Sequence, residues 1–364
     1  MTAESTMTTS VTMESATTAS GAIKKGGKLL GIESGRGIAA MLVVFYHAAR
    51  HMQQDIGYLP LHGIANFGHA GVDFFFVLSG FIIYYVHGFD FSHPERLGHY
   101  IERRFTRIYP FFWCVLAVTL VLAALSTHQP FPGIARVVKT FFLFPQIEDP
   151  IVGVAWTLEL EVVFYLIFAC AILSARWGIA LFSVWLGFIL ACGVTGYVST
   201  HSALLNELGR SFDIEFFFGI AAAVIIRRKI KLPRGLLPIG AILFLLAGTV
   251  ENLGHLDGFG TLARYAYGLP AFMILLGLAE RERAGRLKLH PLLVTLGSAS
   301  YAIYLTHLIS IGVIYKLLSV TKLLGVLPVT LTYLALCIGS IAAAVLISRY
   351  VEYPLMGRVR RILA

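Results

Sequence analysis

Charged residues are scarce in this chain. Asp, Glu, Lys and Arg make up 13% of its 364 residues, whereas a soluble domain carries about 25%. Hydrophobic residues make up 57%, and the mean hydropathy is +0.77. This balance excludes an ordinary soluble enzyme, including one with a single membrane anchor. It indicates a polytopic membrane protein.

Cysteine is also rare. The four cysteines, Cys114, Cys170, Cys192 and Cys337, all lie within apolar segments, and none forms a CxxC pair. We interpret them as small core residues rather than as disulfide or metal ligands. No group of His, Asp and Glu has the spacing of metal ligands either, so we expect no bound metal.

Long apolar segments occupy most of the chain after a Ser/Thr-rich start. Residues 1–28 contain no apolar run of signal-peptide length, and we predict a disordered cytoplasmic tail there. Residues 29–364 are predicted to form one transmembrane domain. Its apolar segments cover residues 34–52, 71–88, 108–127, 152–173, 178–198, 212–227, 235–250, 262–279, 295–318 and 326–348. We therefore expect an all-α bundle of about ten transmembrane helices.

Two shorter stretches do not fit this scheme. Residues 139–146 are too short to span a membrane and are predicted to be interfacial or re-entrant. The sequence RYVEYPL, residues 349–355, is predicted to end the last helix at the cytoplasmic side.

The basic residues support this topology. With ten spans and both termini in the cytoplasm, 22 of the 29 Lys and Arg residues fall on the cytoplasmic side and 7 on the outer side. If one span fewer were assigned, every later loop would change sides and the excess of basic residues on the cytoplasmic side would disappear. The net charge of +9 therefore reflects membrane topology, and we expect no nucleic-acid partner.

Two polar side chains interrupt the first apolar segment. Arg36 and His47 are eleven residues apart, which is almost three helical turns. They therefore share a face, roughly 16 Å apart along the helix axis. Ionisable groups inside a membrane helix are costly and are functional by default. The plain alternative is a snorkelling arginine and an interfacial histidine.

The next two segments add further ionisable side chains. Asp73 lies in the run GVDFFFVLSGF, where it either caps a helix start or belongs to a site, and Ser79 lies deeper. The stretch RRFTRIYPFFW begins with Arg103, and its Arg104 and Arg107 share one helical face. Two guanidinium groups on one face can bind a phosphate group, although an ordinary cytoplasmic loop would also carry them.

Two later segments carry polar side chains at membrane depth. Glu161, in WTLELEVVFY, lies at a depth comparable with His47 and can either pair with it or form a structural hydrogen bond between helices. Tyr301, Tyr304 and His307 lie in SYAIYLTHLI, with His307 one turn after Tyr304. A histidine there is either a packing residue or part of a site.

Together these motifs resemble the membrane-bound acyltransferase-3 family, which includes O-acetyltransferases of exopolysaccharides and O-antigens. The resemblance covers about residues 31–356. It rests on six motifs in order, namely Arg36 with His47, then residues 71–81, 103–113, 156–161, 300–307 and 351–354. Thr157 stands where the family commonly has serine. Glu161 lacks the adjacent glutamate of many members, so a two-carboxylate role is not implied.

The resemblance implies an acetyl-coenzyme A-dependent O-acetyltransferase in the inner membrane of a bacterium. The acyl group would pass to a hydroxyl of a glycan, an exopolysaccharide or its lipid-linked precursor. Other implied partners are the lipid bilayer and polysaccharide-assembly proteins. The anionic coenzyme would dock on Arg36, Arg103, Arg104 and Arg107.

The resemblance also suggests chemical roles. His47 would be the general base on the sugar hydroxyl. Glu161 or Asp73 would hold its tautomer or bind sugar hydroxyls. The candidates for substrate binding or oxyanion stabilisation are Ser79, Tyr301, Tyr304 and His307. Direct transfer and a His-linked acetyl intermediate both remain compatible with the sequence.

Two alternatives stay open at this point. One is an acyltransferase acting on a lipid, a peptide or a small metabolite. The other is a transporter or flippase, since ten helices with intramembrane charges fit it equally well.

Overall fold

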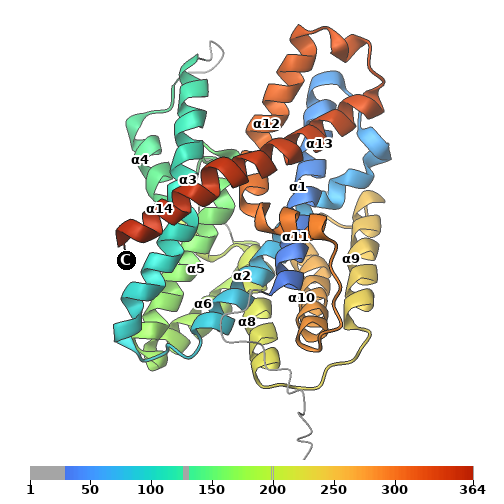
Figure 1. Ribbon diagram of the computed structural model, residues 1–364. Coiled ribbons are helices and arrows are strands. Elements are labelled where there is room, and N and C mark those ends of the chain that lie inside the picture. The colour runs from blue at the N-terminus through green and yellow to red at the C-terminus, as the bar shows by residue number, and fades with distance from the viewer. Residues whose placement is uncertain (1–28, 126–130, 198, 200, 364) are drawn as a thin grey trace, which may run out of the picture.

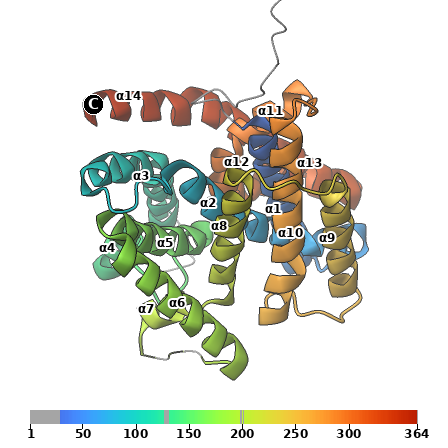
Figure 2. The same cartoon turned by 90° about the horizontal axis from the view of Figure 1, so that it is seen from below.

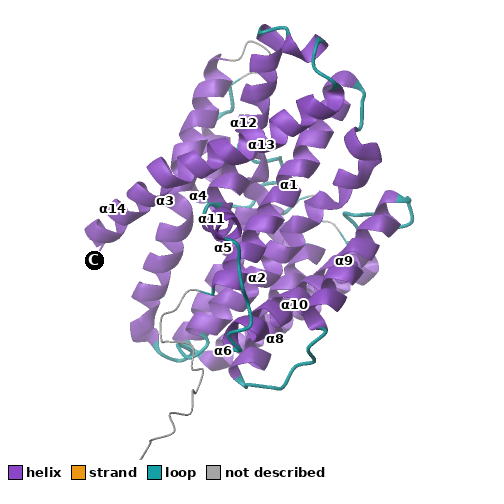
Figure 3. Ribbon diagram, turned by 45° about the vertical axis from the view of Figure 1, so that its right-hand side comes forward, coloured by secondary structure: helices purple, strands orange, loops and turns teal. Residues whose placement is uncertain are grey.

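The chain folds into a bundle of helices. A computed structural model describes residues 29–125, 131–197, 199 and 201–363 (Figure 1). Within these residues every regular element is helical and none is a strand (Figure 3). The all-α prediction is thus confirmed for the described part of the chain. The predicted tail, residues 1–28, lies outside the described residues.

The helices have these bounds. The first half contains α1 (Leu30–Ile56), the 3-10 helix η1 (Pro60–Ala70), α2 (Gly71–His87), α3 (Leu97–Leu125), α4 (Ile134–Phe142), α5 (Trp156–Leu173), α6 (Ala175–Thr195) and α7 (Ala203–Leu208). The second half contains α8 (Ile214–Arg227), α9 (Leu236–Asn252), α10 (Thr261–Arg283), α11 (Pro291–Ser298), α12 (Ser300–Val320), α13 (Val329–Ile347) and α14 (Tyr353–Leu363).

Helix α1 lies in the middle of the bundle and contacts α2, α10, α11, α12 and α13 (Figure 2). Gly37 lets its backbone approach α11 so closely that a Cβ there would lie 2.6 Å from the nitrogen of Gly297. The N-terminus of α1 is also held, because the Gly31 N–H donates to the Glu282 carboxylate of α10 at 3.0 Å. These contacts fix the depth and rotation of the helix that carries the first motif.

Helices α2 and α8 cross at two glycines. A Cβ at Gly80 would overlap the carbonyl oxygen of Phe216, and one at Gly219 would overlap that of Val77. Small residues commonly allow membrane helices to approach this closely. Gly80 therefore serves close packing, and the crossing sets the position of its neighbour Ser79.

Seven helices in the described residues are long and apolar enough to cross a membrane. The other three predicted spans are also helical and correspond to α1, α8 and α9. Helix α8 has 14 residues and α9 has 17, which is short for a hydrocarbon core of about 30 Å. Helix α1 is long but carries ionisable side chains in its apolar run. Ten spans and two cytoplasmic termini therefore stay predictions.

Two boundaries differ from the prediction. The predicted span 295–318 is broken at Ala299, between α11 and α12. RYVEYPL does not end the last helix, because the chain continues through a π-helical turn, Ser348–Glu352, into α14, which packs on α3 (Figure 1). Pro354 follows this turn directly, and it has no N–H to continue the helical hydrogen bonds.

The glycine crossing gives a stability prediction. We expect Gly80→Ala to destabilise the protein by about 1–3 kcal/mol, because the new methyl group must push α2 from α8. Gly187→Ala on α6 is the matched control, since a Cβ there meets open space. Thermal unfolding of the detergent-purified variants measures the difference. Equal melting temperatures would contradict the tight crossing.

Candidate active site

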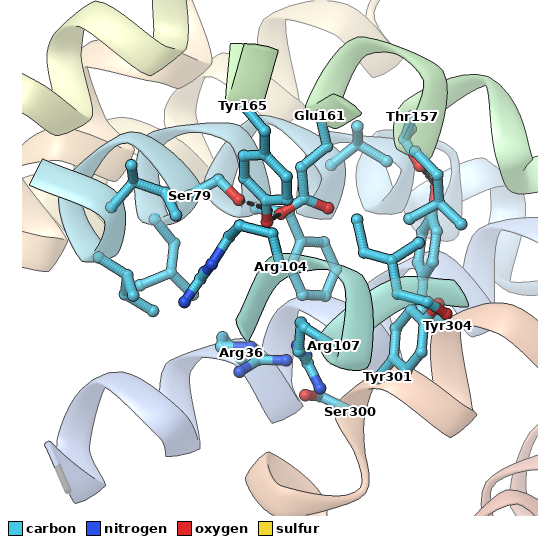
Figure 4. Close-up of a pocket in the computed structure, with 17 residues that line it drawn as sticks. Arg36, Ser79, Arg104, Arg107, Thr157, Glu161, Tyr165, Ser300, Tyr301 and Tyr304 are labelled. Carbon is cyan, nitrogen blue, oxygen red and sulfur yellow. Dashed lines mark hydrogen bonds between the residues drawn. The ribbon is translucent and has the colours of Figure 1, made fainter. Parts of the chain in front are cut away.

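A cavity of about 230 Å³ lies between α1, α2, α3, α5 and α12 (Figure 4). Its polar lining consists of Arg36, Ser79, Arg104, Arg107, Thr157, Glu161, Tyr165, Ser300, Tyr301 and Tyr304. Seven of the predicted site residues are among them. Five motifs that are far apart in the sequence thus meet around one space.

The cavity is cationic, because three arginines but one carboxylate line it. Arg36 comes from α1, and Arg104 and Arg107 come from the shared face of α3 (Figure 4). Aromatic faces cover two of the guanidinium groups. The Arg104 guanidinium carbon is 5.6 Å from the Tyr165 ring centroid, and that of Arg107 is 4.7 Å from the Tyr301 centroid. Such contacts stabilise cations away from water.

Arg103 does not line the cavity. It is exposed, because one residue along a helix turns the side chain by about 100°. Its predicted role in coenzyme A binding has no support in this geometry. Arg107 has a further partner instead, the buried Glu352 carboxylate 3.8 Å away, which also accepts a hydrogen bond from Ser348 at 2.7 Å. The RYVEYPL motif therefore contacts the RRFTRIYPFFW motif.

Glu161 accepts two hydrogen bonds at the cavity wall. The Ser79 hydroxyl donates to it at 2.6 Å, and the Tyr165 hydroxyl donates to the same oxygen (Figure 4). These bonds hold the carboxylate between α2 and its own helix. No hydrogen bond among the described residues joins Glu161 to His47, so the predicted pairing is not formed.

The hydroxyls predicted as oxyanion donors already have protein partners. Ser79 is engaged as above, and Tyr301 donates to the main-chain carbonyl of Ile108 at 2.9 Å. The Tyr304 and Thr157 hydroxyls lie 2.9 Å apart. Each candidate must therefore exchange a hydrogen bond before it can stabilise an oxyanion.

His47 lies beside a second histidine. The ring centroids of His47 and His307 are 5.0 Å apart, and His307 is fully buried. Nδ1 of His307 donates to the Tyr304 carbonyl at 2.6 Å, since a carbonyl oxygen only accepts. Its Nε2 has no partner among the described residues and is an acceptor in the neutral ring. Neutral His307 can thus bind a hydroxyl group but cannot donate to an oxyanion.

Tyr304 connects the cavity with this histidine pair. It lines the cavity, and its ring centroid is 5.9 Å from that of His307. The ring of Phe75, also in the lining, packs edge-on against Tyr304 at 5.4 Å. His47 itself is outside the lining. A ligand beside Tyr304 in the cavity would therefore contact Tyr304 first. The His307 ring packs against Tyr304, and the His47 ring packs against His307.

Asp73 lies in a separate ion pair that sequence reasoning missed. Its carboxylate accepts a hydrogen bond from Arg264 of α10, and both side chains are 0% exposed. Arg264 also donates to the Gly258 carbonyl and lies over the Phe212 ring at 3.9 Å. The available signal was an arginine inside the predicted span 262–279. Asp73 thus joins α2 to α10, and it does not hold the tautomer of His47 in this structure.

Apolar helices surround a cationic cavity and a histidine pair, of which His307 is buried and His47 half-buried. These features define an integral membrane protein that can receive an anionic ligand. A family model described as an acyltransferase domain matches residues 29–349. The chain therefore belongs to the acyltransferase-3 family, as its motifs predicted.

Two relatives extend this result. The chain is 29% identical over 320 residues to the exopolysaccharide production protein ExoZ of Rhizobium meliloti (strain 1021), covering 82% of this chain and 93% of that protein. It is 25% identical over 314 residues to the acyltransferase MdmB of Streptomyces mycarofaciens, covering 78% and 79%. No solved structure matches the chain.

The Asp73–Arg264 pair gives a second prediction. We expect Asp73→Asn to lower the stability by about 3–5 kcal/mol, because it removes one partner of a fully buried ion pair. Glu148→Gln is the control, since it breaks an exposed pair with Arg136 that is worth about 0–1 kcal/mol. Thermal unfolding distinguishes the two variants. A stable but inactive Asp73→Asn protein would instead assign Asp73 to the chemistry.

Proposed function

We propose that this protein transfers an acetyl group from cytoplasmic acetyl-coenzyme A to a hydroxyl of a glycan. One observation carries the proposal: Arg36, Arg104 and Arg107 line a single cavity that ends one ring contact from the His47–His307 pair. An anion site joined to candidate bases is the arrangement that acyl transfer from an anionic thioester needs.

The arginines would bind the phosphate groups of the donor. Guanidinium groups bind phosphate oxygens through paired, charge-assisted hydrogen bonds. The pantetheine arm would then extend through the cavity toward Tyr304. The rise of roughly 16 Å between Arg36 and His47 on α1 is on the scale of that arm.

His47 would act as general base during transfer. It removes the proton from the acceptor hydroxyl, whose oxygen attacks the thioester carbonyl carbon. The carbon–sulfur bond then breaks, and the coenzyme A thiolate leaves and takes up the proton. His307 would accept a hydrogen bond from a neighbouring hydroxyl of the same sugar through its unpartnered Nε2, since the reacting hydroxyl gives its one proton to His47. Tyr304, the predicted oxyanion candidate nearest the pair, would turn its hydroxyl from Thr157 to the developing oxyanion.

The glycan acceptor is supported by the relative whose name refers to exopolysaccharide production. A polysaccharide or its lipid-linked precursor would reach His47 from the outer side of a bacterial inner membrane. Polysaccharide-assembly proteins would supply it. Mass analysis of surface glycans from a strain that lacks this protein tests the acceptor. We expect one polysaccharide to lose its acetyl groups.

The role of His47 is tested by His47→Ala. We expect acetyl transfer to fall about a hundredfold or more, because general-base catalysis contributes about 10²–10⁴. Coenzyme A binding should not change, since His47 does not line the cavity. His99→Ala, on the exposed part of α3, is the control for loss of an imidazole. Wild-type rates in the His47→Ala protein would rule out this mechanism.

The donor site is tested by two neighbouring arginines. We expect Arg104→Leu to weaken coenzyme A binding by about tenfold to a hundredfold, since a hydrogen bond to a charged group is worth about 1.5–3 kcal/mol. Arg103→Leu should bind coenzyme A like wild type, because Arg103 is exposed outside the cavity. Isothermal titration of both proteins decides the matter. Equal losses would show that bulk positive charge, rather than the cavity, binds the coenzyme.

A further inference from the structure

A second pocket opens beside the cavity, between the N-terminal end of α1 and the C-terminal end of α2. Its volume is about 280 Å³. Arg36 and Ile82 line both this pocket and the cavity, so the two spaces meet at these side chains. The remaining walls are Leu29, Ile32, Glu33, Phe81, Tyr85 and Val86.

Size alone indicates that a coenzyme A molecule needs both spaces. Small-molecule sites usually have about 300–1,000 Å³. The cavity, at about 230 Å³, and the side pocket, at about 280 Å³, each fall below that range, but together they lie within it. Coenzyme A also has two ends of different shape, a slender arm and a bulky nucleotide, which meet at a pyrophosphate.

The side pocket has the chemistry that a purine ring prefers. The rings of Phe81 and Tyr85 are stacked in parallel, with centroids 5.3 Å apart and planes at 10°. Tyr85 lies one helical turn beyond Phe81 and is in the pocket wall. A flat base binds about tenfold or more tightly when it stacks on such a ring. Arg36 stands at the junction with the cavity, where a phosphate between base and arm would lie.

We propose that this side pocket binds the adenine nucleotide of the acyl-coenzyme A donor, with the purine against Tyr85. The pyrophosphate would lie at Arg36, and the arm would turn into the cavity toward Tyr304. The inference rests on the proposed function, because it assigns one end of the same donor. It adds Tyr85 as the residue that distinguishes a nucleotide-bearing thioester from one without a nucleotide.

The test compares two donors on the full-length purified protein. Acetyl-coenzyme A carries the nucleotide, and S-acetyl-4′-phosphopantetheine carries the arm and one phosphate without it. We expect Tyr85→Ala to lower kcat/KM for acetyl-coenzyme A by about tenfold or more while kcat/KM for the short donor is unchanged. Tyr85→Phe keeps the ring and should retain wild-type values. Tyr350→Ala, an exposed tyrosine outside both spaces, is the control.

The outcomes separate this inference from the proposed function. If wild type uses acetyl-coenzyme A and Tyr85→Ala uses it equally well, the nucleotide pocket is wrong and the acetyltransferase stands. If Tyr85→Ala loses both donors to the same extent, Tyr85 has a structural role and the inference is again wrong. If wild type neither binds coenzyme A nor turns over either donor, both the proposed function and this inference are wrong.

Discussion

The placement of three half-buried arginines inside an apolar bundle is the constraint on which the rest of the site depends. A charged side chain at the centre of a membrane helix costs about 2.5–3.5 kcal/mol or more unless it has partners. The aromatic face of Tyr165 is such a partner for Arg104, and the face of Tyr301 and the carboxylate of Glu352 are partners of Arg107. These three side chains come from α5, α12 and the π-helical turn before α14. Compensating the arginines therefore requires motifs from distant parts of the chain to meet, and a cationic cavity is the result.

Hydrogen bonds between uncharged and acidic side chains also join the motifs in pairs. Ser79 of α2 donates to Glu161 of α5, and Thr157 of α5 lies in hydrogen-bond contact with Tyr304 of α12. The resting site is thus cationic, while its hydroxyl groups form hydrogen bonds with protein acceptors. Under the proposed function, the arriving substrate must draw Tyr304 away from Thr157 before an oxyanion is stabilised. Donor binding and the formation of the oxyanion site would then be separate steps.

The sequence predicted most of the helices and seven of the ten polar side chains that line the cavity. Apolar length identified the helices, and helical periodicity placed Arg104 and Arg107 on one face, both of which are local properties. Partners across helices could not be predicted, because the rotation of each helix is set by packing such as the Gly80–Phe216 approach. Asp73 therefore pairs with Arg264, 191 residues away, rather than with His47. Likewise, α12 packs the His307 ring against His47, and the predicted pairing of His47 with Glu161 is not formed.

Under the proposed function, a coenzyme A thioester held by the arginine cavity is the acyl donor. The most direct test follows label from acetyl-coenzyme A, carried on the acetyl group, with purified protein in lipid vesicles and a crude glycan acceptor. We expect the label to appear on the glycan as a base-labile ester, in the same amount as the free coenzyme A thiol that is released. A protein that binds no coenzyme A and releases no thiol would contradict it.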